Sequence, residues 1–392
     1  MKKVFTILGK DAIIRQGSKK NIWGGNMKKV LGFLLIALVS FGALIGCGKD
    51  EETYEIALIT DVGNIDDKSF NEGAWNGVKQ FAENCNISYA YYRPSEDSTA
   101  ARVETIQNAI AKGATVVVCP GYLFEEAIYN VESTYPEVDF LLLDGEPHNA
   151  DYSTYLTTSN VHCILYQEEQ AGYLAGYAAV MDGYTELGFV GGMAVPAVVR
   201  YGYGYVQGAD AAAQEKNVNI NIKYYYADAF VGSDALEAKM DGWYAAGTEI
   251  VFACGGKLYT SVVAAAENAE KKVIGVDVDQ YFVSDVIVTS AMKGLTVSVV
   301  DSLVALYNNS VYTSEGVSRE WPEGFAGVTS TLGAAVDGIG LPTADTSWGF
   351  STFTVAEYEV LYAKLVAGTI VVSNVTTVAP TVSSHTTVDY SA

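Results

Sequence analysis

The chain is poor in the residues from which most catalytic and metal sites are built. Only three histidines occur in 392 residues, and the five cysteines lie singly at 47, 85, 119, 163 and 254. Neither set has the spacing of a metal site, so zinc binding is not expected. The nucleophile elbow, the zinc-protease motif and the phosphate-binding loop are missing as well. We therefore expect no cofactor and no enzymatic activity.

Positive charge is also scarce, with 24 lysines and arginines against 46 aspartates and glutamates. Residues 1–47 hold eight of the basic residues and only one acid, so the rest of the chain has a net charge of −29. Such a surface repels nucleic-acid phosphates, which argues against a nucleic-acid partner. It favours a soluble monomer, and an anionic ligand would need a local basic site.

One long apolar run is present, at Leu31–Ile45, and two lysines precede it. It is too short for a spanning helix and is typical of a secretory signal. The run ends in Leu44-Ile45-Gly46-Cys47, which resembles a bacterial lipobox, where Cys47 becomes the lipid-bearing first residue. An ordinary cleaved signal with a chance cysteine is the alternative. We expect a signal at 27–47, a non-native extension at 1–26, and a mature chain anchored on the extracytoplasmic face of the cell membrane.

From residue 54 onward, short β-branched runs alternate with helical patterns, which predicts parallel sheets flanked by helices. There are too many predicted strands for one sheet, so we expect two similar lobes. The strands are predicted near 55–60, 87–92, 115–119, 139–143, 155–158, 187–191, 219–226, 249–254, 272–277 and 286–290. The helices are predicted near 70–84, 98–112, 123–133, 166–182, 199–215, 234–246, 259–270, 295–308 and 355–367.

Small residues in the helix predicted at 166–182 allow close packing on a sheet or at a hinge. We expect the chain to change lobes near 159–167 and again near 281–286. The resulting division is a linker at 48–53, one lobe from 54–160 and 286–310, a second lobe from 161–285 and 311–373, and a flexible tail at 374–392.

The stretch from Asp61 to Asn71 joins the first predicted strand to the first predicted helix. Ser69 and Glu72 have the spacing of a capping box, which places Phe70 and Asn71 in the first helical turn. Polar or aromatic residues follow other predicted strands too, at Tyr122, Asp144, Lys257 and Asp277. Because open α/β sheets bind ligands beyond the carboxyl ends of their strands, this pattern favours a binding cleft over a set of plain turns.

Several motifs together resemble the basic membrane protein family of bacterial lipoproteins, the purine-nucleoside-receptor-like substrate-binding proteins of ABC importers. They are DVGNIDDKSFN at 61–71, FVGGM at 189–193 with Pro196, Arg200, Tyr201, Gly204, Tyr205 and Gly208, the glycine pair at 255–256, VIGVDVDQ at 273–280 and TSAMK at 289–293. The resemblance covers about residues 54–372.

This resemblance implies an α/β fold of two Rossmann-like lobes with parallel sheets joined by a hinge, the type I periplasmic binding protein architecture. The lobes would close on a nucleoside, with purines favoured, for delivery to ABC permease subunits. Carried over position by position, Phe70 and Tyr205 would stack on the base from opposite lobes. The remaining ligand contacts would come from Asp61, Asn71 and Asp144 at the polar edge of the base or the adjoining pocket, and from Gly256, Asp277 and Lys293 at the ribose end.

Two positions depart from the family pattern and leave the preferred nucleoside open. Tyr205 stands where phenylalanine is usual, and Lys257 stands where a small residue is usual. Two other functions also remain open. One is a sensor or binding protein for another small ligand such as a sugar, and the other is a surface adhesin with a vestigial cleft.

Overall fold

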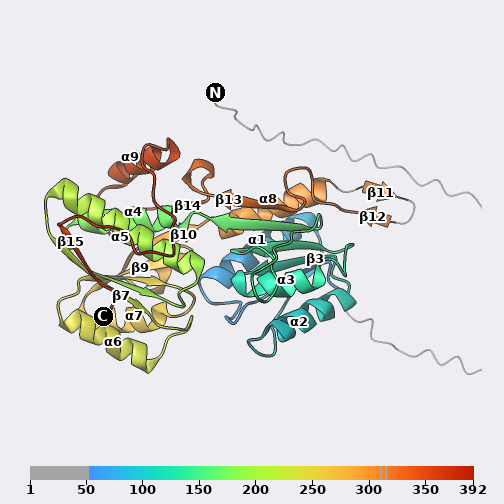
Figure 1. The fold of residues 1–392 in the computed structure, drawn as a ribbon, viewed down its shortest axis with the longest axis horizontal. Helices are drawn as coiled ribbons and strands as arrows, with labels where there is room; N and C mark the ends of the chain where they lie inside the picture. The colour runs from blue at the N-terminus through green and yellow to red at the C-terminus, as the bar shows by residue number, and fades with distance from the viewer. Residues whose placement is uncertain (1–52, 310, 314–315) are drawn as a thin grey trace, which may run out of the picture. The chain divides into compact units, whose positions relative to one another are not determined.

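The computed structural model describes residues 53–309, 311–313 and 316–392. The extension at 1–26, the signal at 27–47, Cys47 and nearly all of the linker at 48–53 lie outside the described residues. The described chain forms two parallel sheets with helices packed on them, and a small hairpin of β11 (Val311–Thr313) and β12 (Gly316–Ser318) (Figure 1).

The first lobe is built on a parallel six-stranded sheet in the order β13-β5-β4-β3-β1-β2. Successive residues of β1 face opposite sides, so Ile56 and Leu58 join one buried cluster while Ala57 and Ile59 join another. The strands are β1 (Ile56–Ile59), β2 (Tyr89–Tyr92), β3 (Val116–Pro120), β4 (Asp139–Leu143), β5 (Val161–Tyr166) and β13 (Val328–Leu332). The helices are α1 (Phe70–Cys85), α2 (Thr99–Ala111), α3 (Glu125–Val131) and α8 (Leu295–Asn308).

The second lobe is built on a seven-stranded sheet in the order β14-β10-β9-β8-β6-β7-β15, in which only the β14–β10 pair is antiparallel. The strands are β6 (Glu186–Gly191), β7 (Ile220–Tyr226), β8 (Ile250–Cys254), β9 (Lys272–Asp277), β10 (Ile287–Lys293), β14 (Ile339–Gly340) and β15 (Thr386–Asp389). The helices are α4 (Glu168–Asp182), α5 (Pro196–Lys216), α6 (Asp234–Ala245), α7 (Tyr259–Ala269) and α9 (Val355–Val366).

The two sheets share one strand order. In the first lobe it is β2-β1-β3-β4-β5, and in the second it is β7-β6-β8-β9-β10. Each sheet therefore has a switch point, between β1 and β3 in one lobe and between β6 and β8 in the other, beside which ligands of such sheets bind. The prediction of two Rossmann-like lobes is confirmed.

The chain crosses between the lobes three times, at Gln167, at Gly294 and at residues 333–338. Hydrogen bonds tie the crossings together: the backbone N–H of Gln167 donates to the carbonyl of Leu332, and that of Gly294 donates to Gly338, both at 2.9 Å. These short, mutually bonded segments form the hinge.

The observed crossings correct the predicted lobe boundaries. The strand expected at 155–158 is only an isolated bridge between His148 and Tyr155, and the true fifth strand is the largely buried run β5, which stays in the first sheet. The crossing expected near 281–286 is a short 3₁₀ turn, and β10 remains in the second sheet. Later, β13 returns to the first lobe. Local apolar patterns do not say which sheet a strand joins.

The tail expected to be flexible at 374–392 is bonded to the second lobe. Its strand β15 pairs in parallel with β7 and so covers that edge of the sheet. Upstream, Ser383 donates from its backbone N–H and from its hydroxyl to Asp210 Oδ1 of α5, at 3.0 and 2.6 Å. The tail therefore supports α5, a helix that also reaches the interlobe cavity described below.

Helices α4 and α5 pack with their backbones in direct contact. A Cβ on Gly172 of α4 would lie 2.1 Å from the carbonyl oxygen of Tyr201, and one on Gly204 of α5 would lie 2.1 Å from that of Glu169. The small residues noted in the sequence thus serve a helix–helix contact at the start of the second lobe.

Candidate functional site

A cavity of about 320 Å³ lies between the carboxyl ends of the two sheets. That volume is at the lower end of the range of small-molecule sites, roughly 300–1,000 Å³. Both switch points contribute to it, through Asp61 and Gly121 after β1 and β3 and through Val195 and Gly255 after β6 and β8. Seven of the eight predicted ligand residues line this cavity: Asp61, Phe70, Asn71, Asp144, Gly256, Asp277 and Lys293.

Tyr205 does not line the cavity, so its predicted place in the ligand site is wrong. Its side chain is fully buried inside the second lobe and packs on Phe252, with ring centroids 5.5 Å apart. One helical turn earlier, Tyr201 does line the cavity. Residues four apart share a helix face, and here only the first of them reaches the open end of the sheet.

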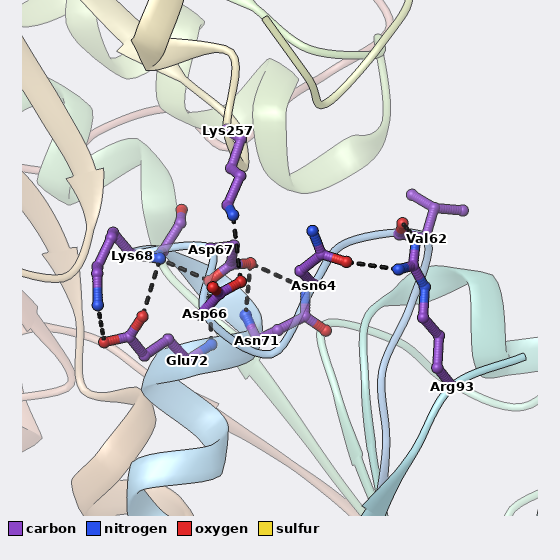
Figure 2. Close-up of polar contacts among 10 residues, drawn as sticks. Val62, Asn64, Asp66, Asp67, Lys68, Asn71, Glu72, Arg93 and Lys257 are labelled. Carbon is purple, nitrogen blue, oxygen red and sulfur yellow. Dashed lines mark hydrogen bonds and ion pairs between the residues drawn. The ribbon is translucent and has the colours of Figure 1, made fainter.

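The first helix is capped by Asp67 rather than by the predicted capping box. Asp67 Oδ1 accepts from the backbone N–H groups of Ser69 and Glu72 at 2.9 and 3.0 Å, and Oδ2 accepts from that of Asn71 at 3.0 Å (Figure 2). A carboxylate at this position satisfies donors that a helix start leaves free. The Ser69 hydroxyl is therefore available to donate to Asp277 Oδ2 of the second lobe, at 2.5 Å.

Asn71 holds Asp61 in place. Its Nδ2 donates to Asp61 Oδ1 at 2.8 Å and to Asp67 Oδ2 at 2.9 Å, while its Oδ1 accepts from the Asp61 backbone at 3.1 Å. Asp61 Oδ1 also accepts from the Gly63 backbone at 2.6 Å. Asp61 Oδ2 lies on the side of Gly121 and the Phe70 ring. A fixed carboxylate thus stands beside an aromatic ring.

A chain of charged groups crosses the cavity from one lobe to the other. The Lys293 ammonium, at the end of β10, pairs with Asp144 of the first lobe and, at 3.0 Å, with Glu168 of α4. Glu168 in turn accepts from Arg200 Nε at 2.5 Å. The ammonium also lies 4.9 Å from the centre of the Phe70 ring, within reach of a cation–π contact. Phe70 and Asp144, both in the first lobe, therefore contact the same lysine of the second lobe.

Burial governs the charges of these groups. It raises the pKa of Asp61 to about 6 and that of Asp144 to about 7, in the second case against the attraction of Lys293. Burial also raises the pKa of Asp277. For Glu168 burial acts in the same direction, but Lys293 and Arg200 outweigh it and hold its pKa below the ordinary value. The cavity thus contains several carboxyl groups whose charged form would be stabilised by a hydrogen-bond donor from a ligand.

Asp144 has one oxygen ready for such a donor. Its Oδ2 pairs with Lys293, whereas its Oδ1 is buried and, within the described chain, has no hydrogen-bond partner. Asp144 and Asp277 both have positive φ, at 60° and 67°. Side-chain-bearing residues adopt this conformation at a cost, and it is concentrated at functional sites.

The predicted ligand residues leave out several members of the cavity and its charge network, among them Tyr201, Arg200, Phe230 and Glu168. Tyr201 and Arg200 lay in a quoted motif, four and five positions before the residue that was chosen instead. Glu168 opens a helix that was predicted for its packing alone, and Phe230 follows a strand whose end carries no motif. Helix phase could have identified Tyr201, because it shares its face with Tyr205.

The four cysteines of the described chain, at 85, 119, 163 and 254, are free thiols. Across residues 53–392, apart from the three that are not described, no group of three or more His, Cys, Asp or Glu side chains could hold a metal ion. In the same part of the chain, no helix has both the length and the apolar character to cross a bilayer.

The model of the Bmp family, described as ABC transporter substrate-binding protein PnrA-like, matches residues 55–329. The chain belongs to this family. Bmp proteins are solute-binding components of ABC transporters and not enzymes, so a small ligand and permease subunits are the partners that membership implies.

Curated relatives agree with the Bmp assignment. The chain is 28% identical over 279 residues to the ABC transporter nucleoside-binding protein BmpA of Lactococcus lactis, covering 65% of this chain and 75% of that one. It is 29% identical over 272 residues to basic membrane protein A1 of Borrelia garinii, covering 68% and 77%.

Solved structures share the fold. An ABC transporter solute-binding protein from Aeropyrum pernix superposes with a TM-score of 0.67 at 20% identity, covering 83% of this chain and 94% of that one. The arabinose-binding protein AraP of Geobacillus stearothermophilus superposes with a TM-score of 0.54 at 13% identity, covering 76% and 99%. The type I periplasmic binding protein architecture is thereby confirmed.

Proposed function

We propose that this Bmp protein captures nucleosides, with purines favoured, in the cavity between its lobes and delivers them to the permease of an ABC importer. One observation carries the proposal: a single cavity holds aromatic rings and hydrogen-bonding carboxylates supplied by both lobes. A family relative that bears the name nucleoside-binding protein supports the same ligand class.

The aromatic walls suit a planar base. Phe70 comes from the first lobe, while Tyr201 and Phe230 come from the second. The Tyr201 hydroxyl donates to the carbonyl of Ala291 at 3.1 Å, which fixes the orientation of its ring. Stacking of a base on an aromatic side chain contributes roughly 1–3 kcal/mol and depends little on which base it is.

The carboxylates suit the polar parts of a nucleoside. Asp61, beside Phe70, would accept from the edge of the base. Asp277 would accept from ribose hydroxyls next to Lys293, and the free Oδ1 of Asp144 would accept from whichever donor lies between. A hydrogen bond to a charged group contributes about 1.5–3 kcal/mol.

The charges favour a neutral ligand over a nucleotide. Of the four basic residues that line the cavity, three are paired with carboxylates: Lys293 with Asp144, Arg200 with Glu168 and Lys257 with Asp66. A phosphate would either have to displace one of these partners or rely on the exposed Arg93 alone, which already donates to Asn64 Oδ1 and to the Val62 carbonyl oxygen. This supports a nucleoside without a phosphate group.

We further propose that Cys47 carries a lipid that holds the mature protein at the extracytoplasmic face of the cell membrane, beside the permease. The lipobox-like sequence before Cys47 supports this placement. An anchored receptor would present captured nucleoside close to the importer.

Calorimetric titration tests the proposal. The purified chain is titrated with inosine, guanosine, adenosine, cytidine and ribose, together with Phe70→Ala and, as a control, Tyr91→Ala, an exposed aromatic outside the cavity. We expect purine nucleosides to bind, Phe70→Ala to weaken them at least about tenfold, and Tyr91→Ala to have no effect, since 1.4 kcal/mol is one decade. Binding of ribose alone, or of none of the five, would refute the proposal.

A further inference from the structure

The loop Asp66–Ser69 makes three polar contacts with the second lobe, to Lys257, Gln280 and Asp277. Asp66 Oδ1 pairs with the Lys257 ammonium (Figure 2), and the two atoms are 3.2 Å apart. The carbonyl oxygen of Lys68 accepts from Gln280 Nε2 at 2.8 Å, and the Ser69 hydroxyl donates to Asp277. The Lys257 contact is exposed, whereas Gln280 is completely buried. The Gln280 bond is partly buried, so leaving its amide unpaired costs more than losing an exposed ion pair.

Gln280 differs from the other contacts because its single amide bonds to both lobes. Its Oε1 accepts from the backbone N–H of Val276 at 3.0 Å, and its Nε2 crosses to Lys68. Its own backbone N–H donates to Ser290 Oγ at 3.0 Å. The strand leaves room for this amide, since a Cβ on Gly275 would lie 2.4 Å from Gln280 Oε1.

Both hydrogen bonds of this amide are made at or next to a residue in the left-handed conformation. Val276 directly precedes Asp277, whose φ is 67°, and the carbonyl on the other side belongs to Lys68, whose φ is 57°. L-residues rarely adopt such angles without outside support. Gln280 supplies hydrogen bonds at the end of β9 and at the loop, and so joins the two strained positions through one side chain.

We propose that Gln280 is a positioning residue that couples contact between the lobes to the orientation of Asp277. When the loop of the first lobe meets Gln280, the amide is fixed from both sides, and Asp277 is held where Ser69 and a ligand hydroxyl reach it. When the lobes separate, the amide loses one partner and the end of β9 is less restrained. The part of this inference that concerns ligand rests on the proposed function, whereas the interlobe part does not.

A purely local role for Gln280 makes a different prediction. If the residue only shaped its own turn, its loss would loosen residues 274–281 and leave the loop of the first lobe unchanged. Coupling requires that a substitution in the second lobe also loosens residues 62–72 in the first. Hydrogen–deuterium exchange with mass spectrometry reads the two segments separately.

The test compares the full chain with Gln280→Met, which keeps the side-chain length but loses both amide bonds, and with Asp279→Ala. The control lies in the same turn, but its carboxylate bonds only within the second lobe, to Ser347 Oγ at 2.5 Å and to the Tyr281 backbone at 3.3 Å. We expect Gln280→Met to speed exchange about three- to tenfold in both segments, because each segment loses one hydrogen bond. We expect Asp279→Ala to affect only its own turn.

Unchanged exchange at 62–72 in Gln280→Met would overturn the coupling. If Gln280→Met does not fold, Gln280→Asn replaces it under the same criterion, because the shorter amide is not able to keep both bonds: faster exchange at 62–72 as well as at 274–281 supports the coupling, and unchanged exchange at 62–72 overturns it. A second measurement follows dissociation of inosine, which we expect to be about three- to tenfold faster in Gln280→Met than in Asp279→Ala. If wild-type protein binds no nucleoside, the proposed function fails while the exchange result still decides the coupling.

Discussion

A buried carboxyl group in the cavity lowers the stability of the fold but can bind a ligand donor. Asp61 sits between a capped loop and an aromatic ring, and burial raises its pKa to about 6. A group whose pKa is raised on folding costs stability at any pH above that value. Its hydrogen bonds to Gly63 and Asn71 do not remove this cost. A carboxylate kept at such a place is expected to serve the ligand.

Asp61→Asn should therefore stabilise the protein at neutral pH. The amide oxygen keeps the two acceptor roles of Oδ1, while the charge that is costly to bury disappears. The cost of the wild-type charge is full above pH 6 and vanishes as pH falls toward 3.8, so the variant should gain about 3 kcal/mol at pH 7–8 and almost nothing near pH 4. Denaturant unfolding at several pH values measures this gain.

Asp66→Asn is the matched control. Asp66 is exposed and pairs with Lys257, which lowers its pKa, so removing its charge should cost stability at neutral pH rather than add to it. A loss of stability in Asp61→Asn at pH 7–8, similar to that of the control, would show that the Asp61 charge is not costly in the folded state.

Packing of two helices determines where the second lobe places its part of the site. Helix α5 carries Arg200 and Tyr201 to the cavity, and α4 begins with Glu168, the partner of Arg200. The direct backbone contact at Gly172 and Gly204 fixes the distance between these helices. Any side chain at that contact would therefore shift the charged groups as well as the core.

Gly204→Ala should destabilise the protein and weaken ligand binding together. Its Cβ would lie 2.1 Å from the Glu169 carbonyl oxygen, so the helices must separate, at a typical cost of about 1–3 kcal/mol. Gly242→Ala in α6 is the control, because its Cβ meets nothing within 4 Å and a helical alanine gains about 0.5–1 kcal/mol over glycine. Denaturant unfolding and inosine titration measure the effects. Equal stability of the two variants would contradict the close packing.

The positions of helices and strands were predicted better than the sheet that each strand joins. The alternation of apolar runs and helical patterns located most strands and helices, including α1, α8 and α9, because these patterns are local. The sequence does not say that β5 and β13 join the first sheet, that β10 stays in the second, or that the tail adds β15. Those choices depend on which exposed strand edge is available, a property of the assembled sheet.

For the molecule as a whole, two lobes with one strand order bring two switch points to one cavity. The family motifs contain six of the seven predicted lining residues, and the seventh, Asp144, follows a predicted strand; the carboxyl ends of these strands meet at the cavity. Tyr205 was misplaced because adjacent turns of a helix carry the same residue type. Gln280 had no signal beyond its motif, because its role requires the other lobe. Sequence thus locates the site, and tertiary contacts assign the roles.

We propose that one nucleoside is held by both lobes at once. Hydrogen–deuterium exchange of the wild-type chain, with and without saturating inosine, tests it most directly. We predict protection of residues 61–72 in the first lobe together with residues 254–258 and 276–280 in the second, since only closure on a shared ligand protects both. Protection confined to one lobe, or no protection in either, would contradict it.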